Sequence, residues 1–407
     1  MKILWHGVPS NFPTGYGVQT KLFTRALKAA GHEVIVSPTC LSIPPHVNDD
    51  GIRVLSAGPR MNMGNDMIVY HANAHKPDMV LSMMDTFIMD AKKFGQLPWV
   101  AWQVIDSAPM LPELMKPARA AKQRVCMSRF GQQTLLEAGF ASDYVPLAFD
   151  PEDYHIAERE SARYRLEKLL RASLTGKFVL CMVAANMSRP SRKNFSAAFR
   201  TVKILRDKRG IDAFLYVHAE CTGTLQRGED LRRMAEGCGL GPDAVMFPSQ
   251  YEYVTGMYHP MYLRNLYNAC DLYLCTSRGE GFGVPLIDAQ ACGLPVAAVE
   301  FSAMPEVLRG PSSCTGRYVT WDYHAGTSQA VVDPQGMADV AEDLYAQHRG
   351  PHWREQCAEM AGEIARDYGI DAVYDRHLSG KLEGWRETVA KHERIENEEP
   401  SEATVHS

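Results

Sequence analysis

Two carboxylates that lie eight positions apart, Glu280 and Asp288, flank a glycine-containing loop and the start of an expected helix. Gly281 and Gly283 leave backbone amides that a bulky anion can approach, and Pro285 suits the first turn of the helix. Amides at a helix N-terminus attract anions because the helix dipole lies behind them. A carboxylate on each side of such an anion site suits a ligand with both phosphates and hydroxyls. A nucleotide sugar is such a ligand.

Residues 267–296 place these features inside a longer pattern, YNACDLYLCTSRGEGFGVPLIDAQACGLPV. The pattern resembles the C-terminal-domain signature of glycosyl transferases group 1, a large GT-B family that uses nucleotide-sugar donors and retains the anomeric configuration. The matching positions are Tyr267, Asp271, Ser277, Glu280, Gly281, Phe282, Gly283, Pro285, Ala289, Ala291, Gly293, Pro295 and Val296. The second acid departs from the family, which normally has Glu where this chain has Asp288. Taken singly, the features also fit an ordinary strand-to-helix turn with Asp288 in solvent.

The resemblance implies roles for the two acids. Glu280 would hydrogen-bond the hydroxyls of the donor sugar and shield an oxocarbenium-like transition state, whereas Asp288 would hold the ribose hydroxyls. Asp is one methylene shorter than Glu, which puts the ribose contact in question. The other donor-binding positions that the motif implies are Gly281, Phe282, Gly283 and Val284.

Fixed cations precede another expected helix, after the first strand of the second half: Arg189, Arg192 and Lys193. Splitting a nucleotide sugar builds negative charge on the β-phosphate, and no DxD-type carboxylate pair that would hold a metal stands out. We therefore expect a metal-independent reaction with no cofactor, in which the nucleotide sugar is a co-substrate. In the resembled family an Arg and a Lys here contact the donor diphosphate. Lys193 matches the Lys, and either Arg189 or Arg192 can stand for the Arg; the alternative is a basic helix start on the surface.

In the first half, the loop PTGYGVQT matches the glycine-rich loop that follows the family's first strand. Gly15 and Gly17 would let backbone approach the diphosphate and the reacting sugar, although a plain turn is the alternative. The family often carries a catalytic His near the end of the fourth or fifth strand, where this chain reads PWVAWQVIDSAPM. Asp106 is the nearest polar candidate for that catalytic position, and a simple loop cap is the other interpretation. His71, His75 and His218 are further candidates.

The elements that must position these residues form two alternating series. Short apolar strands alternate with segments that have apolar residues at helical spacing, which indicates parallel sheets covered on both faces. The expected strands of the first series are 2–8, 32–38, 77–83, 98–105 and 123–128, with helices at 18–31 and 129–139. The expected strands of the second series are 177–184, 212–218, 244–248, 271–277 and 294–300, with helices at 194–208, 229–236 and 260–268.

The fold class is therefore α/β, with two doubly wound, Rossmann-like domains, and the resemblance implies the GT-B architecture, in which they face each other across a cleft. We expect an N-terminal, acceptor-side domain over 1–150 and a C-terminal, donor-side domain over 151–370. A helix over 371–391 would cross back to the first domain, and 392–407 would be a disordered tail, because it is polar and charged.

Composition bounds the class of protein. The 407 residues suffice for two domains, and the net charge of −5 gives no signal for general nucleic-acid binding. The ten cysteines form no CxxC pair and no zinc-spaced grouping, so reduced thiols and a cytoplasmic location are expected. MKILWHGVP lacks the apolar stretch of a signal peptide, and no apolar run approaches the length of a transmembrane helix.

The sequence thus predicts a retaining hexosyltransferase that takes UDP- or GDP-hexose as donor. Its acceptor is not specified and includes macromolecules. Two alternatives on the same fold stay open: an epimerase-like or phosphorylase enzyme, and a non-catalytic sugar-nucleotide binding protein. A phosphorylase would need a pyridoxal-binding Lys, for which the sequence has no signature.

Overall fold

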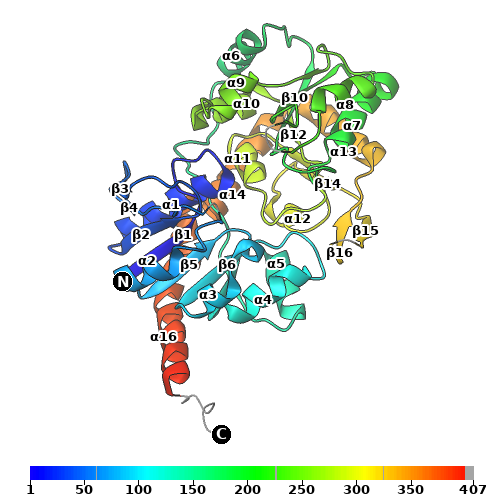
Figure 1. Ribbon diagram of the computed structural model, residues 1–407. Helices are drawn as coiled ribbons and strands as arrows, with labels where there is room; N and C mark the ends of the chain where they lie inside the picture. Colours follow the sequence, from blue (N-terminus) through cyan, green and yellow to red (C-terminus); the bar gives the residue numbers. More distant parts are fainter. Residues whose placement is uncertain (61, 225–226, 324, 399–407) are drawn as a thin grey trace. The chain divides into compact units, whose positions relative to one another are not determined.

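The computed structural model describes residues 1–60, 62–224, 227–323 and 325–398 (Figure 1). The chain forms two compact units. The first comprises residues 1–148 and the C-terminal segment from residue 370, and the second comprises residues 149–369. Both are α/β units built on sheets whose cores are parallel, which confirms the predicted fold class.

The first unit contains an eight-stranded sheet with the order β3-β4-β2-β1-β5-β6-β7-β8. Its strands are β1 (Lys2–Gly7), β2 (Glu33–Pro38), β3 (His46–Val47), β4 (Arg53–Val54), β5 (Met79–Met83), β6 (Trp99–Gln103), β7 (Gln123–Cys126) and β8 (Asp143–Tyr144). Neighbouring strands are parallel except β3 and β4, which pair antiparallel at the edge. That edge pair carries no periodic signal in the sequence because each strand is only two residues long.

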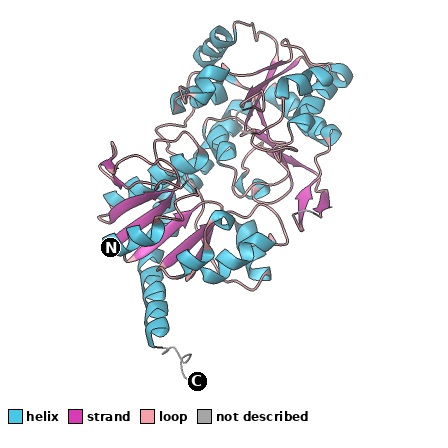
Figure 2. Cartoon of the chain, in the orientation of Figure 1, coloured by secondary structure: helices cyan, strands magenta, loops and turns pink. Residues whose placement is uncertain are grey.

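Helices cover this sheet (Figure 2). They are α1 (Gly15–Ala29), α2 (Ile68–His75), α3 (Ala91–Gly95), α4 (Pro112–Ala120) and α5 (Arg129–Glu137), with a short 3₁₀ helix, η1 (Thr86–Ile88). Aromatic side chains fill the layers between the sheet and its helices. Phe23 of α1 packs on Trp102 of β6 with ring centroids 4.8 Å apart, and Phe94 of α3 packs on Trp99 at 4.9 Å. Trp99 and Trp102 are an odd number of residues apart and therefore face opposite sides of the sheet, so both of its faces are covered.

The C-terminal segment of the first unit contains α15 (Ile370–Val373), a π-helical turn η2 (Tyr374–Leu378), a 3₁₀ turn η3 (Ser379–Lys381) and α16 (Leu382–Glu398). Asp143 of β8 anchors this segment. It accepts a hydrogen bond from Trp385 Nε1 at 2.7 Å and forms an ion pair with Lys381 Nζ at 3.1 Å. The helix continues to Glu398, so residues 392–398 are helical where the sequence predicts a disordered tail. The remainder of that tail, 399–407, lies outside the described residues.

The second unit contains a six-stranded parallel sheet, in the order β11-β10-β9-β12-β13-β14, and a separate antiparallel hairpin of β15 and β16. The strands are β9 (Phe178–Val183), β10 (Ala213–His218), β11 (Val245–Met246), β12 (Leu272–Leu274), β13 (Val296–Val299), β14 (Ser313–Thr315), β15 (Val319–Asp322) and β16 (Thr327–Ala330). The helices are α6 (Arg159–Leu170), α7 (Phe195–Arg209), α8 (Leu231–Gly237), α9 (Gln250–Val254), α10 (Pro260–Ala269), α11 (Val284–Ala291), α12 (Met304–Val307), α13 (Pro334–His348) and α14 (Trp353–Tyr368).

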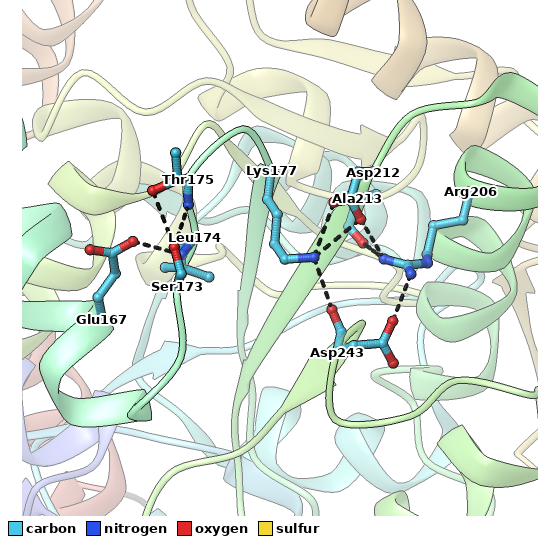
Figure 3. Close-up of polar contacts among 9 residues, drawn as sticks. All are labelled: Glu167, Ser173, Leu174, Thr175, Lys177, Arg206, Asp212, Ala213 and Asp243. Carbon is cyan, nitrogen blue, oxygen red and sulfur yellow. Dashed lines mark hydrogen bonds and ion pairs between the residues drawn. The ribbon is translucent and has the colours of Figure 1, made fainter.

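A charge network joins the amino ends of β9, β10 and β11 in this second sheet (Figure 3). Asp212, just before β10, accepts from Lys177 at 3.1 Å and from Arg206 of α7 at 2.7 Å. Arg206 also reaches Asp243, just before β11, at 2.7 Å. The two carboxylates are more than half exposed, so water screens these pairs and each contributes little to stability. The network lies at the amino edge of the sheet, away from the edge where parallel sheets bind ligands.

Asp271, which matches the family motif, is a buried structural carboxylate. It accepts ion pairs from Arg159 and from Arg163 at 3.0 Å, and a hydrogen bond from the Val179 amide at 2.7 Å. Burial by itself raises the pKa of Asp271, but a hydrogen bond from His348 and the two guanidinium groups hold it well below its usual range. Asp271 therefore ties α6 and α13 to the middle of the sheet.

Candidate functional site

The order of the second sheet reverses at β9, because β10 and β12 pair on its two sides. Open α/β sheets bind ligands beside the carboxyl ends of their strands at such a switch point. The loop that follows β9, residues 184–194, carries the predicted cations, and the loop that follows β12, residues 275–283, carries Glu280. The topology therefore brings together two segments that are more than eighty residues apart in the sequence.

Lys193 and Glu280 form an ion pair between these two loops, from Nζ to Oε1. Arg192 approaches the second carboxylate oxygen, with Nη1 3.3 Å from Oε2, and also donates to the Gly279 carbonyl. Burial raises the pKa of Glu280. Lys193, Arg192 and a hydrogen bond from Ser277 outweigh that effect and lower the pKa to about 2. Glu280 is therefore an ionised acceptor at any physiological pH.

The backbone around Glu280 is fixed by its neighbours. The Glu280 amide donates to Ser302 Oγ at 2.8 Å, and its carbonyl accepts from the Ala303 amide at 3.3 Å. Thr276 Oγ1 donates to the Lys193 carbonyl at 3.0 Å. The carboxylate and its cationic partner therefore sit on backbone that is hydrogen-bonded on both sides, which limits the movement of either group.

The two candidate arginines are separated by their contacts. Arg192 lies at Glu280, whereas Arg189 turns toward a different loop and donates to the carbonyls of Gly228 and, at 3.2 Å, Gly223. Of the two, Arg192 is the one that the fold groups with Lys193. Whether either contacts a diphosphate stays a prediction.

The glycine loop leads into α11 with the geometry that the sequence predicts. Gly283 precedes the helix with φ of +97°, a left-handed value that strains any residue with a Cβ, and Pro285 lies in the first turn. Phe282 is buried, and its ring meets that of Tyr368 edge to face at 5.5 Å. The loop residues Gly281 and Phe282 are buried, and Val284, the first residue of α11, is half-buried.

Asp288 lies inside α11 and is only 6% exposed. Its Oδ1 has no hydrogen-bond partner, and neither does the hydroxyl of Tyr267. Burial, helped by the charge of Asp153, raises the pKa of Asp288 well above its usual value. The alternative interpretation, in which Asp288 is a helix residue in solvent, is therefore wrong. Its contact with ribose hydroxyls stays a prediction. The unpaired buried oxygen of Asp288 is an acceptor that could form such a hydrogen bond.

A histidine surrounded by tyrosine rings lies at the carboxyl end of β10, the strand beside β9. His218, the last residue of β10, has ring centroids at 5.0–5.5 Å from Tyr253, Tyr258 and Tyr262. Its Nδ1 has no hydrogen-bond partner, and burial lowers its pKa to about 4. The sequence places His218 at a strand end but does not indicate the surrounding tyrosines, which come from α9 and the region of α10.

In the first unit, the glycine loop caps α1. Thr14 Oγ1 accepts from the Gly17 amide at 3.1 Å. A Cβ at Gly17 would lie 2.2 Å from the Phe12 carbonyl oxygen, so this position needs glycine for packing alone, whereas nothing lies within 4 Å of a Cβ at Gly15. The intervening Tyr16 donates from its hydroxyl to Asp85 at 2.9 Å, just after β5. Sequence analysis did not identify this link.

Asp106 lies three residues after β6 and is half-buried. Gln103, the last residue of β6, is fully buried, and both polar atoms of its amide lack a partner. Thr86, after the adjacent strand β5, has a buried hydroxyl that also lacks one. Sequence analysis did not single out Gln103, although a polar residue that ends an apolar strand is a usable signal.

Comparison with known proteins places this architecture. A family model described as "Glycosyl transferases group 1" matches residues 177–346, which span both loops of the candidate site. Residues 177–346 of this chain are thus similar to the glycosyl transferases group 1 family. A D-inositol 3-phosphate glycosyltransferase of Segniliparus rotundus is 33% identical over 103 residues, which are 25% of this chain and 21% of that protein. One from Thermomonospora curvata is 31% identical over 152 residues, which are 37% of this chain and 30% of that protein. The matched stretches thus cover less than a third of either relative.

Solved structures show that the chain has the GT-B fold. A sucrose-phosphate synthase from Thermosynechococcus elongatus aligns with a TM-score of 0.72 at 15% identity, covering 96% of this chain and all of that one. HepE from Anabaena, solved in complex with UDP-glucose, aligns with a TM-score of 0.66 at 15% identity, covering 94% of this chain and all of that one.

The described part of the chain lacks two further kinds of feature. No helix there is both long and apolar enough to cross a membrane. Nor do the described residues contain a group of three or more His, Cys, Asp or Glu side chains that could hold a metal ion. Metal independence itself stays a prediction.

Proposed function

We propose that the protein transfers a hexose from UDP- or GDP-hexose to an acceptor hydroxyl, with retention of configuration and without a metal. The single observation that carries the proposal is the ion pair of Lys193 with Glu280 at the switch point of the second sheet. It puts a cation suited to phosphate directly beside a carboxylate suited to sugar hydroxyls.

In the proposed reaction, the bond from the anomeric carbon to the β-phosphate oxygen breaks, and a bond from the acceptor oxygen to that carbon forms. The acceptor hydroxyl gives its proton to a base, either the Asp106 carboxylate or an oxygen of the departing diphosphate. Lys193 and Arg192 would neutralise the charge that develops on the departing diphosphate. A preorganised donor of this kind contributes on the order of 3 kcal/mol of transition-state stabilisation. Glu280, ionised because its pKa is about 2, would accept hydrogen bonds from the sugar.

The unpaired oxygen of buried Asp288 supports a nucleotide-sugar donor that presents a hydroxyl to it. That hydroxyl would supply the hydrogen bond that the oxygen lacks within the protein. Burial raises the pKa of Asp288 and so favours its neutral form, which can donate a hydrogen bond as well as accept one.

A panel of UDP- and GDP-hexoses tests the proposal, with liberated nucleoside diphosphate as the readout and mass spectrometry of candidate acceptors as the second. We expect diphosphate release from at least one donor. Binding of a donor with no release would favour a non-catalytic sugar-nucleotide binding protein, and conversion to an isomeric nucleotide sugar would favour an epimerase-like enzyme. Either result would overturn the proposed transfer.

A further inference from the structure

The hairpin of β15 and β16 is a separate element of the second unit. Its strands pair antiparallel over four residue pairs, from Val319 with Ala330 to Asp322 with Thr327. It forms a two-stranded sheet of its own, and Figure 1 shows it standing apart from the six-stranded sheet of its unit. Both of its strands are therefore edge strands, and a two-stranded hairpin has no core of its own to bury side chains.

Aromatic side chains are exposed on this hairpin. Tyr323 is 88% exposed, Tyr318 61% and Trp321 44%, and Val319 and Val331 beside them are also exposed. Val319 and Trp321 lie two residues apart on β15, so their side chains leave the same face. Elsewhere in this unit, Tyr216, Tyr267, Phe195, Phe199, Phe214 and Phe282 are completely buried. Exposed aromatic and apolar side chains that gather on one hairpin are typical of a binding surface.

Backbone hydrogen bonds connect the hairpin to the candidate site. The Ala330 amide donates to the Arg278 carbonyl at 2.8 Å, and the Arg278 amide donates to the Arg192 carbonyl at 2.9 Å. Arg278 belongs to the loop that carries Glu280. At the base of the hairpin, the Val331 amide donates to the Tyr318 carbonyl at 2.8 Å. The hairpin is thus continuous, through two hydrogen bonds, with the segment assigned to the donor diphosphate.

The net charge of the hairpin favours some classes of ligand over others. Among its described residues from 317 to 331, Arg317 and Asp322 are the two charged side chains, and their charges cancel. Thr320, Ser328 and Gln329 add uncharged hydrogen-bonding groups. Nucleic acid needs clustered cations for its phosphates, and the hairpin offers a single arginine. A neutral, polyhydroxylated ring suits it better, because the C–H face of a pyranose stacks on aromatic rings while its hydroxyls meet polar side chains.

We propose that this hairpin docks a saccharide acceptor, so that the sugar chain lies across Trp321 and Tyr323 while its end is presented to the donor loop. The inference rests on the proposed function for the role of the saccharide as acceptor of the transferred hexose. The binding of a saccharide by the hairpin does not depend on catalysis and is measured without a donor.

The test is calorimetric and saturation-transfer titration of the full chain with neutral oligosaccharides: mannohexaose, maltohexaose and cellohexaose. At least one should bind, and Trp321→Ala and Tyr323→Ala should each weaken that binding by about tenfold, as expected for the loss of one aromatic contact. Tyr70→Ala is the matched control, because Tyr70 is a 66% exposed tyrosine on α2 of the first unit. It should bind like the parent.

Binding of UDP and GDP, measured in the same variants, separates this inference from the proposed function. Lost saccharide binding with intact diphosphate binding supports a hairpin dock. The inference is overturned if no oligosaccharide binds, if Trp321→Ala binds as tightly as the parent, or if an oligodeoxynucleotide binds the hairpin instead. It is also overturned if light scattering shows a dimer that Trp321→Ala dissociates, since a second copy would then cover the face.

Discussion

Lys193 and Glu280 join the loops that follow β9 and β12 through an ion pair, and Arg192 lies 3.3 Å from the second carboxylate oxygen. In the free protein, the cations proposed for the diphosphate are therefore held by the acid proposed for the sugar. A donor would have to take over these cations and release the carboxylate to the sugar hydroxyls. Donor binding and the orientation of Glu280 are coupled in this way, because one set of charges serves both states.

Glu280→Gln tests the sugar-binding role. The substitution keeps the size of the side chain but removes the charge that accepts sugar hydroxyls, so turnover should fall by at least about tenfold. Asp212→Asn is the control, because Asp212 belongs to the exposed charge network at the opposite edge of the same sheet (Figure 3). It should retain parental turnover. A Glu280→Gln enzyme within about twofold of the parent would refute the role.

Arg192→Ala combined with Lys193→Ala should weaken binding of UDP and GDP by about tenfold or more, and of uridine and guanosine much less. Both cations are assigned to phosphate rather than to the base. Calorimetric titration of the four ligands gives the comparison. Arg189→Ala should have the smaller effect, since its guanidinium is engaged by the carbonyls of Gly223 and Gly228. Equal losses for nucleotide and nucleoside would mean that the pair only shapes the unit.

Chelation tests the metal-independent mechanism. We expect transfer to continue in EDTA, because Lys193 and Arg192, with the amides at the start of α11, are assigned the charge that a metal would otherwise neutralise. Rates are measured with and without chelator, and again after addition of magnesium or manganese. Loss of transfer in EDTA followed by recovery with either metal would show that the assignment is wrong.

His218 predicts a pH dependence of stability. Burial lowers its pKa from 6.5 to about 4, so between these values the unfolded chain binds a proton that the folded chain does not. The contribution of His218 to the free energy of unfolding is therefore fully present above pH 6.5. It decreases by on the order of 3 kcal/mol as the pH falls toward 4. Burial raises the pKa values of the phenols around it, Tyr216, Tyr253, Tyr258 and Tyr262, so they stay neutral throughout this range.

Urea unfolding of the parent and of His218→Phe between pH 7 and pH 4 measures this contribution. The phenylalanine ring suits the aromatic surroundings and cannot be protonated, so the variant should lose less stability over the acid range. Parallel pH profiles for the two proteins would contradict the assignment. His6 and His71, which both hydrogen-bond to Ser37 and have pKa values lowered to about 4, add their own acid sensitivity to both proteins.

The sequence predicts the two parallel sheets well, because buried strands are continuous apolar runs and the helices between them have clear periodicity. It also places Glu280 and Lys193 correctly on loops after strands. It does not predict that they touch, since that contact depends on β9 and β12 being neighbours in the sheet. The choice between Arg189 and Arg192 is likewise decided by side-chain direction, which spacing does not encode.

Other features escape the sequence for different physical reasons. The sequence offers Asp288 either as a ribose-binding acid or as a solvated helix residue, and its burial follows from the way α11 packs in the folded unit. The β15–β16 hairpin has no signal that separates its aromatic residues from core residues, because strand-forming aromatics are usually buried. The helical extension to Glu398 shows that a polar, charged segment can continue a helix once packing has begun it.

Asp106→Asn is the sharpest test in the first unit. Asp106 lies three residues beyond β6, where relatives are expected to carry a histidine that assists the acceptor or the reacting carbon. A carboxylate there would take the acceptor proton or stabilise positive charge, so the variant should transfer at least about a hundredfold more slowly while its affinity for UDP and GDP barely changes. Near-parental turnover would make Asp106 a loop cap.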